Sequence, residues 1–288
     1  MVRKINAPGL DIRWAVELYR GCNHPCAYCY VTGTHLYRGS ESGDQMAERI
    51  TVKLNAARVL REELTDPTWC GEPVILGSGG DPYQPSEVKY RLTRQALGLF
   101  LSLGQPCVVL TKSTLILRDL EVLRALAEQD CVQVLFSLCS LDEKVWRHVE
   151  PRASNPQRRL QALARLVVAG VPAGIVLGPV LPDLTDAPQH LEALTQTAAD
   201  HGARFLARNV SEMRTGSVDW YQPQLRELYP HITPQYLKYY RGRYHGSMYT
   251  QEVLAQIESL RRRYELPARP LLAPSRRTHG QLSFAIEG

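Results

Sequence analysis

Short apolar runs alternate with longer segments of helical periodicity along most of this 288-residue chain. The apolar runs are five or six residues long and rich in Val, Ile and Leu, which is typical of buried strands. They predict strands over residues 14–18, 73–77, 107–111, 132–137, 173–178 and 204–209. The segments between and after them predict helices over residues 45–64, 88–103, 118–129, 157–169, 187–201 and 250–264. Gly104, Gly170 and Gly202 follow three of these helices, where a glycine commonly ends a helix.

Six successive strands with helices between them predict an α/β fold in which helices cover a parallel sheet. A partial (β/α)6 TIM-like barrel fits the pattern, and a doubly wound sheet is the alternative that periodicity does not separate from it. In both folds functional groups lie at the carboxyl ends of the strands. We expect the barrel to occupy residues 1–209, and residues 210–288 to form a C-terminal helical extension packed on it.

Hydropathy predicts neither a membrane segment nor a leader. The chain contains no apolar run of about 18 residues, so no membrane span and no membrane partner are expected. The first residues, Met1 to Asn6, lack the apolar core of a signal peptide. A cytoplasmic location is therefore the expectation.

The net charge of +5 is unevenly distributed. Residues 204–288 carry 13 basic against 7 acidic side chains and eight of the fourteen tyrosines. Basic and aromatic residues together are what a nucleic-acid surface needs, although solvated helices packed on the barrel explain them equally well. The candidate phosphate contacts are Lys238, Arg241, Arg243 and Arg261 to Arg263, and the candidate stacking residues are Tyr239, Tyr240 and Tyr244.

Three of the seven cysteines, Cys22, Cys26 and Cys29, lie within eight residues in a Cys-x3-Cys-x2-Cys pattern. In a cytosolic chain such clustering favours metal or redox chemistry over a disulfide framework. Thiolates suit iron–sulfur clusters and zinc, and three of them leave one iron of a cubane open to an external ligand. A zinc site recruiting His24 or a distant cysteine is the alternative, but no second Cys-x2-Cys pair exists for it. We expect His24 to be exposed or to lie behind the ligands.

The spacing Cys-x3-Cys-x-aromatic-Cys, with Tyr28 as the aromatic residue, resembles the signature of the radical S-adenosylmethionine (SAM) superfamily. More specifically, the chain resembles the spore photoproduct lyase-like branch, often labelled "DNA repair photolyase". The segments that carry this second resemblance are 52–56, 81–87, 110–113, 118–120, 150–153, 159–160 and the pair Tyr240 and Tyr244.

The resemblance implies a partial barrel with the cysteine loop after its first strand. It implies a [4Fe-4S] cluster on Cys22, Cys26 and Cys29 that cleaves S-adenosylmethionine reductively to a 5′-deoxyadenosyl radical. That radical abstracts hydrogen from a substrate, in a lyase-like reaction in this branch. The implied partners are a reductant such as flavodoxin or ferredoxin and a nucleic acid.

The same resemblance implies a set of cofactor contacts. Ser78, Gly79 and Gly80 follow the second strand and offer backbone N–H groups to the cofactor carboxylate, while Asp81 meets its ammonium group. The other contacts are Tyr28, Tyr30, Lys112, Ser137 and Pro179. Each also has a plainer interpretation: turn glycines, a lysine whose charge reaches solvent, a capping serine and a turn proline.

One position departs from the branch pattern. Spore photoproduct lyases carry a hydrogen-donating cysteine just after the second strand, where this chain has Ser78. Because residues alternate along a strand, Cys139 shares a face with Ser137 and is the candidate donor in its place. A small buried cysteine is the alternative. Arg152, Arg158 and Arg159 suit either an anionic ligand or, for the last two, a solvated helix start.

Three functional hypotheses follow. The first is a radical SAM enzyme acting on a nucleic acid or nucleotide, and the second is one acting on a small molecule or peptide, which Ser78 favours. The third is a non-catalytic iron–sulfur or zinc protein.

Overall fold

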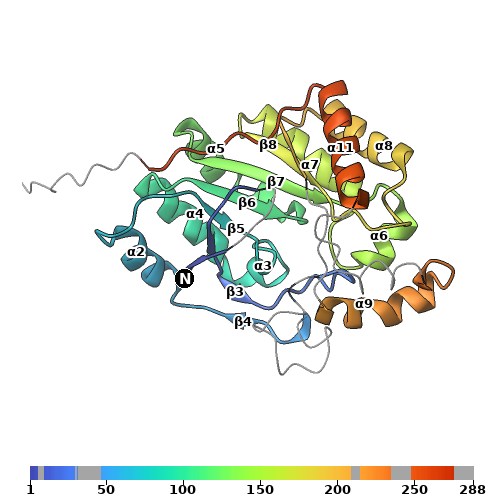
Figure 1. Cartoon of the computed structure of the whole chain (residues 1–288). Coiled ribbons are helices and arrows are strands. Elements are labelled where there is room, and N and C mark those ends of the chain that lie inside the picture. The colour runs from blue at the N-terminus through green and yellow to red at the C-terminus, as the bar shows by residue number, and fades with distance from the viewer. Residues whose placement is uncertain (6–9, 30, 32–46, 209–214, 235–247, 276–288) are drawn as a thin grey trace, which may run out of the picture.

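The computed structural model describes residues 1–5, 10–29, 31, 47–208, 215–234 and 248–275 (Figure 1). Its main sheet has seven strands, in the order β1-β2-β5-β6-β7-β8-β9. These are β1 (Val2–Lys4), β2 (Trp14–Val16), β5 (Val74–Leu76), β6 (Cys107–Thr111), β7 (Val132–Leu138), β8 (Ala173–Leu177) and β9 (Leu206–Arg208). Strand β1 pairs antiparallel with β2, and every later pair is parallel. A second sheet pairs β3 (Tyr19–Arg20) with β4 (Thr51–Val52).

The strand order confirms the partial barrel. Each parallel strand lies beside the one that precedes it along the chain, so every crossover winds in the same direction. A doubly wound sheet would reverse its strand order at a switch point. The alternative left open by periodicity is therefore wrong, and the six parallel strands form an open α/β barrel.

The described helices lie mainly on the outside of this barrel (Figure 1). They are α2 (Ala56–Thr65), α3 (Ser86–Tyr90), α4 (Leu92–Leu103), α5 (Leu120–Glu128), α6 (Glu143–Val149), α7 (Pro156–Val168), α8 (Pro188–Asp200), α9 (Thr215–Leu228), α11 (Met248–Arg263) and the 3-10 helix η3 (Thr114–Asp119). Local chemistry sets their ends: Asn155 accepts a hydrogen bond from Gln157 N at the start of α7, and Gly104 ends α4 in the left-handed conformation.

Two predicted helices are wrong in part. The helix expected over 45–64 is interrupted because Thr51 and Val52, both β-branched, pair with β3, and the helix begins only at Ala56. The helix expected over 88–103 is divided at Arg91, whose φ of 51° ends α3 before α4 begins. Strand β1 and helix α6 were not expected at all.

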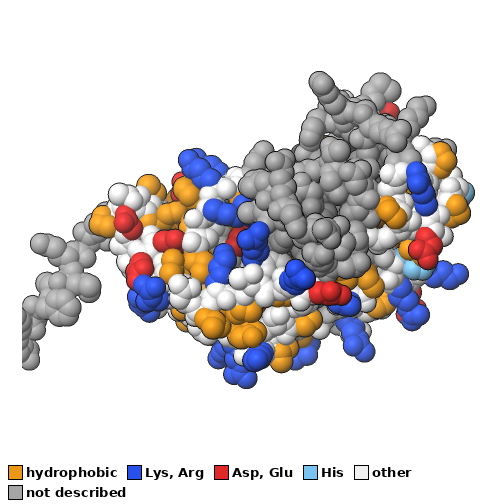
Figure 2. Space-filling model, turned by 90° about the horizontal axis from the view of Figure 1, so that it is seen from below, with side chains coloured by type: hydrophobic (Ala, Val, Ile, Leu, Met, Phe, Trp, Pro, Cys, Tyr) orange, Lys and Arg blue, Asp and Glu red, His pale blue; other side chains and the backbone are white. Residues whose placement is uncertain are grey.

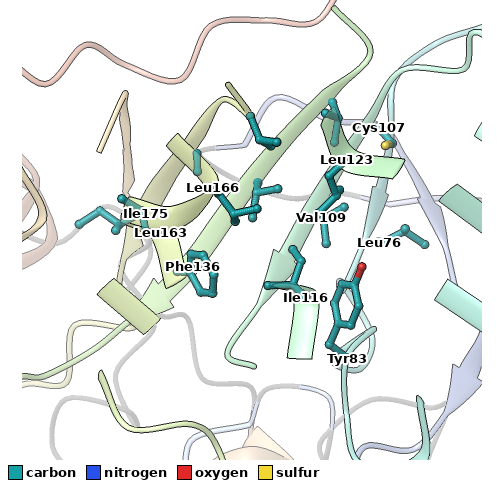
Figure 3. Packing of buried hydrophobic residues seen from close by; sticks show 14 of the residues in the cluster. Leu76, Tyr83, Cys107, Val109, Ile116, Leu123, Phe136, Leu163, Leu166 and Ile175 are labelled. Carbon is teal, nitrogen blue, oxygen red and sulfur yellow. The ribbon is translucent and has the colours of Figure 1, made fainter. Parts of the chain in front are cut away.

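The two faces of the sheet bury different cores. Helix-facing strand residues such as Leu76, Val109 and Phe136 share one core with helical residues such as Leu123, Leu163 and Leu166 (Figure 3). The opposite face forms the barrel interior, and its residues are Ala15, Ile75, Val108, Leu135, Val176 and Ala207. Because side chains alternate along a strand, this apolar layer becomes the floor for the residues that follow toward the carboxyl ends.

The C-terminal part of the described chain joins the same core. Val253, Ile257 and Leu260 of α11 are buried with barrel residues, and α11 packs against α8 and β9. Past α11, a bridge joins Leu206 to Ala268. The expected boundary after residue 209 stays a prediction. Within the described ranges, no helix has the length and hydropathy to span a membrane.

Candidate active site

The cysteine loop follows β3 and folds back on itself. Within it, Cys26 N donates to His24 O at 2.9 Å and Cys29 N donates to Cys26 O at 3.1 Å. Cys22 and Cys26 are buried, Cys29 is partly buried, and all three are thiols rather than disulfides. Burial raises the pKa of Cys22 to about 12, with further contributions from Asp81 and Cys29. Burial likewise raises the pKa of Cys26, which feels the charges of both other cysteines.

This donor set fits an iron–sulfur cluster. In the part of the chain that the structure describes, no three His, Cys, Asp or Glu side chains converge on a single metal-ion position. A cubane does not require such convergence, because each thiolate binds a different iron atom. Three soft ligands on one short loop, two of them buried and one accepting a backbone N–H at its sulfur, suit such a cluster.

The glycine loop after β5 contacts the cysteine loop directly. Asp81 N donates to Cys22 Sγ at 3.3 Å, and Gln84 side-chain atoms bond Gly21 O at 3.3 Å and Asn23 N at 2.9 Å. A Cβ atom on Gly80 would lie 2.9 Å from Gly21 O and 3.6 Å from Cys22 Cβ. Gly80 is therefore required by close approach of two backbones, as well as being available to a ligand.

The Asp81 carboxylate is engaged by the protein itself. It accepts hydrogen bonds from Thr111 Oγ1 at 2.7 Å, Lys112 N at 2.7 Å and Tyr83 N at 2.8 Å. Although burial alone would raise its pKa, His24 and these donors lower it to about 2. Its visible role is to join the glycine loop to the end of β6, and the predicted ammonium contact stays a prediction.

His24 is buried, with 5% of its surface exposed, and its Nδ1 lies 3.4 Å from Asp81 Oδ2. Of the two positions expected for His24, exposed or behind the ligands, burial excludes the first. Among the described residues it sits behind the cysteine loop, beside Asp81.

Lys112 follows β6 and faces the cysteine loop. Its Nζ lies 5.7 Å from the centroid of the Tyr28 ring, a cation–π distance. Burial would lower its pKa, but the nearby Cys26, Glu150 and Asp81 raise it overall, so the side chain stays charged. The structure thus brings the cation at the end of β6 together with two residues of the cysteine loop, Tyr28 and Cys26.

A buried ion pair lies beneath Lys112. Glu150 and Arg159 are almost fully buried and form a salt bridge, and Tyr28 Oη donates to the other Glu150 oxygen. Arg159 also donates to Ser137 O at 2.7 Å and Ser154 O at 2.6 Å. The solvated helix start expected for Arg159 is therefore wrong, because each of its nitrogens bonds the protein interior.

The ends of β7 and β8 meet at the same place. Ser137 Oγ donates to Gly178 O at 3.0 Å, and Gly178 is joined to the buried Pro179 by a cis peptide. Cys139 is 3% exposed and packs with Cys26, Ala27 and Tyr28. Alternation along β7 thus brings Ser137 and Cys139 to the cysteine-loop side of the barrel, as expected.

Glu17 is a site residue that was missed from the sequence. It lies two positions beyond the inward-facing Ala15, accepts Ser78 Oγ at 2.6 Å and pairs with Arg3 at 3.1 Å. A Cβ on Gly79 would lie 2.7 Å from its carboxylate. The available signal was a charged residue at an inward position of a buried strand. Burial raises its pKa despite the Ser78 and Arg3 contacts.

Two of the segments that supported the family branch form a structural network. Glu87 and Asp119 are fully buried and share Arg118, which donates to both at 2.9 Å and 2.8 Å. Tyr83 Oη donates to Asp119 at 3.1 Å, and Tyr19 Oη donates to Glu87. This network gives segments 81–87 and 118–120 a structural role in supporting the loops.

Several predicted residues lie outside the described ranges or are already paired. Tyr30, Lys238, Tyr239, Tyr240, Arg241, Arg243 and Tyr244 are not among the described residues. Of the basic run on α11, Arg261 and Arg262 pair with Glu258 at 2.6 Å and 3.1 Å, and Arg263 pairs with Glu192 at 2.6 Å. On the face in Figure 2, Lys and Arg side chains are spread around the grey residues, with Asp and Glu among them.

A family model described as "Radical SAM superfamily" matches residues 16–194, which include the cysteine loop and most of the barrel. A protein of Mycobacterium tuberculosis, described only as uncharacterised, is 35% identical over 262 residues, covering 91% of this chain and 77% of the relative.

Solved structures share the fold. A spore photoproduct lyase mutant with bound S-adenosylmethionine and dinucleoside spore photoproduct matches with a TM-score of 0.65 at 17% identity, over 91% of this chain and 76% of that one. SuiB of Streptococcus suis, bound to S-adenosylmethionine, matches with a TM-score of 0.51 at 18% identity, over 78% of this chain and 47% of that one.

Proposed function

Because the chain belongs to the radical SAM superfamily, we propose that it binds a [4Fe-4S] cluster through Cys22, Cys26 and Cys29 and cleaves S-adenosylmethionine reductively. When bound, the cluster and the cofactor supply a carbon radical that takes a hydrogen atom from the substrate. The observation that carries the proposal is the contact between two loops: the buried thiol of Cys22 accepts the N–H of Asp81 at 3.3 Å, at the carboxyl end of the barrel.

Lys112 and Ser137 bind the cofactor in this proposal. Lys112 keeps its charge inside the protein, beside Tyr28, where it can pair with an anionic group of a ligand. The carboxylate of S-adenosylmethionine is such an anion, and Lys112 is the group that pairs with it. The backbone of Gly79 and Gly80 and the hydroxyl of Ser78 lie across the site and orient the same end of the cofactor, with Pro179 shaping its far side.

Cys139 is proposed as the hydrogen-atom donor, in place of the cysteine that Ser78 replaces. Burial, followed by the charge of Glu150, raises its pKa well above the ordinary value, so the sulfur keeps its hydrogen. Its packing with Tyr28 and Cys26 places the sulfur beside the cysteine loop and supports a role near the cofactor.

We propose a nucleic acid or nucleotide as the substrate. Support comes from the spore photoproduct lyase fold match and from the excess of basic and tyrosine side chains in residues 204–288. Arg261, Arg262 and Arg263 form ion pairs within the chain, so we assign phosphate binding to the basic residues outside the described ranges. DNA that raises 5′-deoxyadenosine formation, with an effect that salt weakens, supports this substrate class. No effect at low salt favours the alternative, a small molecule or peptide.

Cluster loading tests the metal assignment directly. Anaerobic reconstitution with iron and sulfide is expected to give about four iron and four sulfide per chain, lost in the Cys22, Cys26 and Cys29 to Ala triple variant. Cys70→Ala, at an exposed cysteine outside the loop, is the matched control and retains the cluster. Zinc without sulfide in the purified protein would contradict the proposal. A one-electron donor such as flavodoxin or ferredoxin is the partner that the chemistry requires, and dithionite replaces it in vitro.

A further inference from the structure

A continuous chain of buried polar contacts joins the cysteine loop to the ends of two strands. It begins at Tyr28, whose hydroxyl donates to Glu150, and continues through the Glu150–Arg159 salt bridge. From Arg159 it reaches the carbonyl of Ser137, at the end of β7, at 2.7 Å, and the carbonyl of Ser154 at 2.6 Å. Ser154 N in turn donates to Lys112 O, at the end of β6, at 3.2 Å.

We propose that Glu150 and Arg159 are a positioning pair for S-adenosylmethionine: they fix the cysteine loop, through Tyr28, relative to Ser137 and Lys112. This inference rests on the proposed function and adds to it two residues that do not touch the cofactor. A cofactor that bridges the open iron of a cluster and a lysine on the barrel must have the two held at a fixed separation. The pair connects the Tyr28 side of the cysteine loop to both strand ends, and Asp81 separately connects Cys22 to the backbone of Lys112.

Burial supports a role beyond surface pairing. Glu150 is 1% exposed and Arg159 is 0% exposed, in a region that also holds Lys112 and the thiols of Cys26 and Cys139. A buried ion pair is a costly way to stabilise a fold, because an apolar pair of similar volume often does as well. An ion pair adds directional bonding: the guanidinium of Arg159 binds three acceptors, two in the segment from Glu150 to Ser154 and one at the end of β7.

The main chain strengthens the same connection. Ala27 N donates to Val149 O at 2.9 Å, next to Glu150, and Ala153 N donates to Glu150 O at 3.1 Å. The segment from Val149 to Ser154 therefore contacts the cysteine loop on one side and the end of β6 on the other. This position gives the Glu150-Pro151-Arg152-Ala153 motif a structural role, and the anion-binding role expected for Arg152 and Arg158 stays a prediction.

Tyr28→Phe and Glu150→Gln test the pair with the least change in shape, and Arg159→Lys is the third variant. Each reconstituted protein is compared by iron and sulfide content, by the change that S-adenosylmethionine causes in the electron paramagnetic resonance (EPR) spectrum of the reduced cluster, and by the Kd for the cofactor. We expect near wild-type loading, a Kd raised 10-fold or more in Glu150→Gln and Arg159→Lys, a smaller rise in Tyr28→Phe, and a weakened spectral change in all three.

Asp119→Asn is the matched control, because Asp119 is also fully buried and shares an ion pair, but it belongs to the network with Arg118 and Tyr83. It is expected to lower thermal stability while leaving the Kd and the cofactor-induced spectral change of the loaded protein intact. If Asp119→Asn raised the Kd as much as Glu150→Gln does, the effect would be one of general stability and the positioning role would be wrong.

The outcome for the pair is separable from that of the proposed function. Wild-type protein that binds S-adenosylmethionine at its cluster but forms no 5′-deoxyadenosine would contradict the proposed reaction. The Kd and the EPR spectra of the variants would still test the positioning role of Glu150 and Arg159. Loaded Tyr28→Phe and Glu150→Gln proteins with wild-type Kd and spectral change would overturn the positioning role, whatever the activity. If Arg159→Lys fails to fold, Tyr28→Phe and Glu150→Gln still test the positioning role.

Discussion

Lys112 lies over the ring of Tyr28, with its Nζ 5.7 Å from the ring centroid, so the end of β6 and the middle of the cysteine loop meet at one point. Residues 84 positions apart in the chain thereby form one wall of the candidate site. The same wall includes Cys26, whose thiol and Lys112 influence each other's pKa.

Lys112→Met removes the cation while keeping much of the side-chain volume. Loss of a charged hydrogen bond of about 1.5–3 kcal/mol is expected to raise the KM for S-adenosylmethionine by roughly 10- to 100-fold. The measurement is 5′-deoxyadenosine formation against cofactor concentration in protein of equal cluster content. Lys144→Met, at an exposed lysine on α6, is the control and keeps the wild-type KM. An unchanged KM in Lys112→Met would remove Lys112 from the cofactor site.

Gly80→Ala introduces a Cβ 2.9 Å from Gly21 O and is expected to force the glycine loop away from the cysteine loop. The expected result is reduced iron and sulfide retention. Gly98→Ala is the matched control, since a Cβ on this helical residue of α4 meets nothing within 4 Å. It is expected to raise the free energy of unfolding by about 0.5–1 kcal/mol with full cluster content. Full iron and sulfide retention in Gly80→Ala would show that the two backbones can separate without loss of the cluster.

Asp119→Asn is expected to lower the free energy of unfolding by about 3 kcal/mol at pH 7, because Arg118 is left without one of its buried partners. Burial acts to raise the pKa of Asp119, but Arg118 and Arg94 lower it overall. A depressed folded-state pKa stabilises the protein above the unfolded value of about 3.9 and loses that effect as the pH falls below it. In urea unfolding from pH 7 to pH 3, the difference in free energy of unfolding between wild type and variant should therefore narrow only below about pH 4. If the difference in free energy of unfolding between wild type and variant stayed constant with pH, Asp119 would stabilise the protein through packing alone.

Cys139→Ser is expected to leave reductive cleavage of S-adenosylmethionine intact and to change the fate of the substrate radical. A thiol that exchanges with solvent carries deuterium in D2O, so wild-type protein should transfer deuterium to nucleosides recovered from a DNA substrate. The label should be lost in Cys139→Ser, because a serine O–H is a poor hydrogen-atom donor. Equal labelling by both proteins would leave Cys139 as a small buried core residue.

Much of the fold was predictable because the strand signal is local. The strands β6 to β8 lie where apolar runs predicted them, since they are buried on both faces. The strand Thr51–Val52 was not predictable, because it is two residues long and exists only through its pairing with Tyr19–Arg20. The choice of barrel over doubly wound sheet likewise depends on which strands become neighbours, and the periodicity of single segments does not contain that information.

The site was predictable where a motif or an alternation pointed to it. The cysteine spacing marked the three thiols that we propose as cluster ligands, and alternation along the predicted strand pointed to Ser137 and Cys139 on one side of the barrel. Glu150 and Arg159 were not predictable as a buried pair, because nine residues separate them and nothing local shows that α7 brings them together. The choice between an exposed and a buried His24 was left open for the same reason, because its neighbour Asp81 lies 57 positions later in the chain.

The most direct test of the proposed S-adenosylmethionine cleavage is anaerobic formation of 5′-deoxyadenosine. Reconstituted protein receives dithionite and S-adenosylmethionine, and the product is quantified beside the Cys22, Cys26 and Cys29 to Ala triple variant and Cys70→Ala. We expect 5′-deoxyadenosine from wild type and Cys70→Ala, and none from the triple variant. Wild-type protein with a complete cluster that forms no 5′-deoxyadenosine, with or without DNA, would contradict the proposed cleavage.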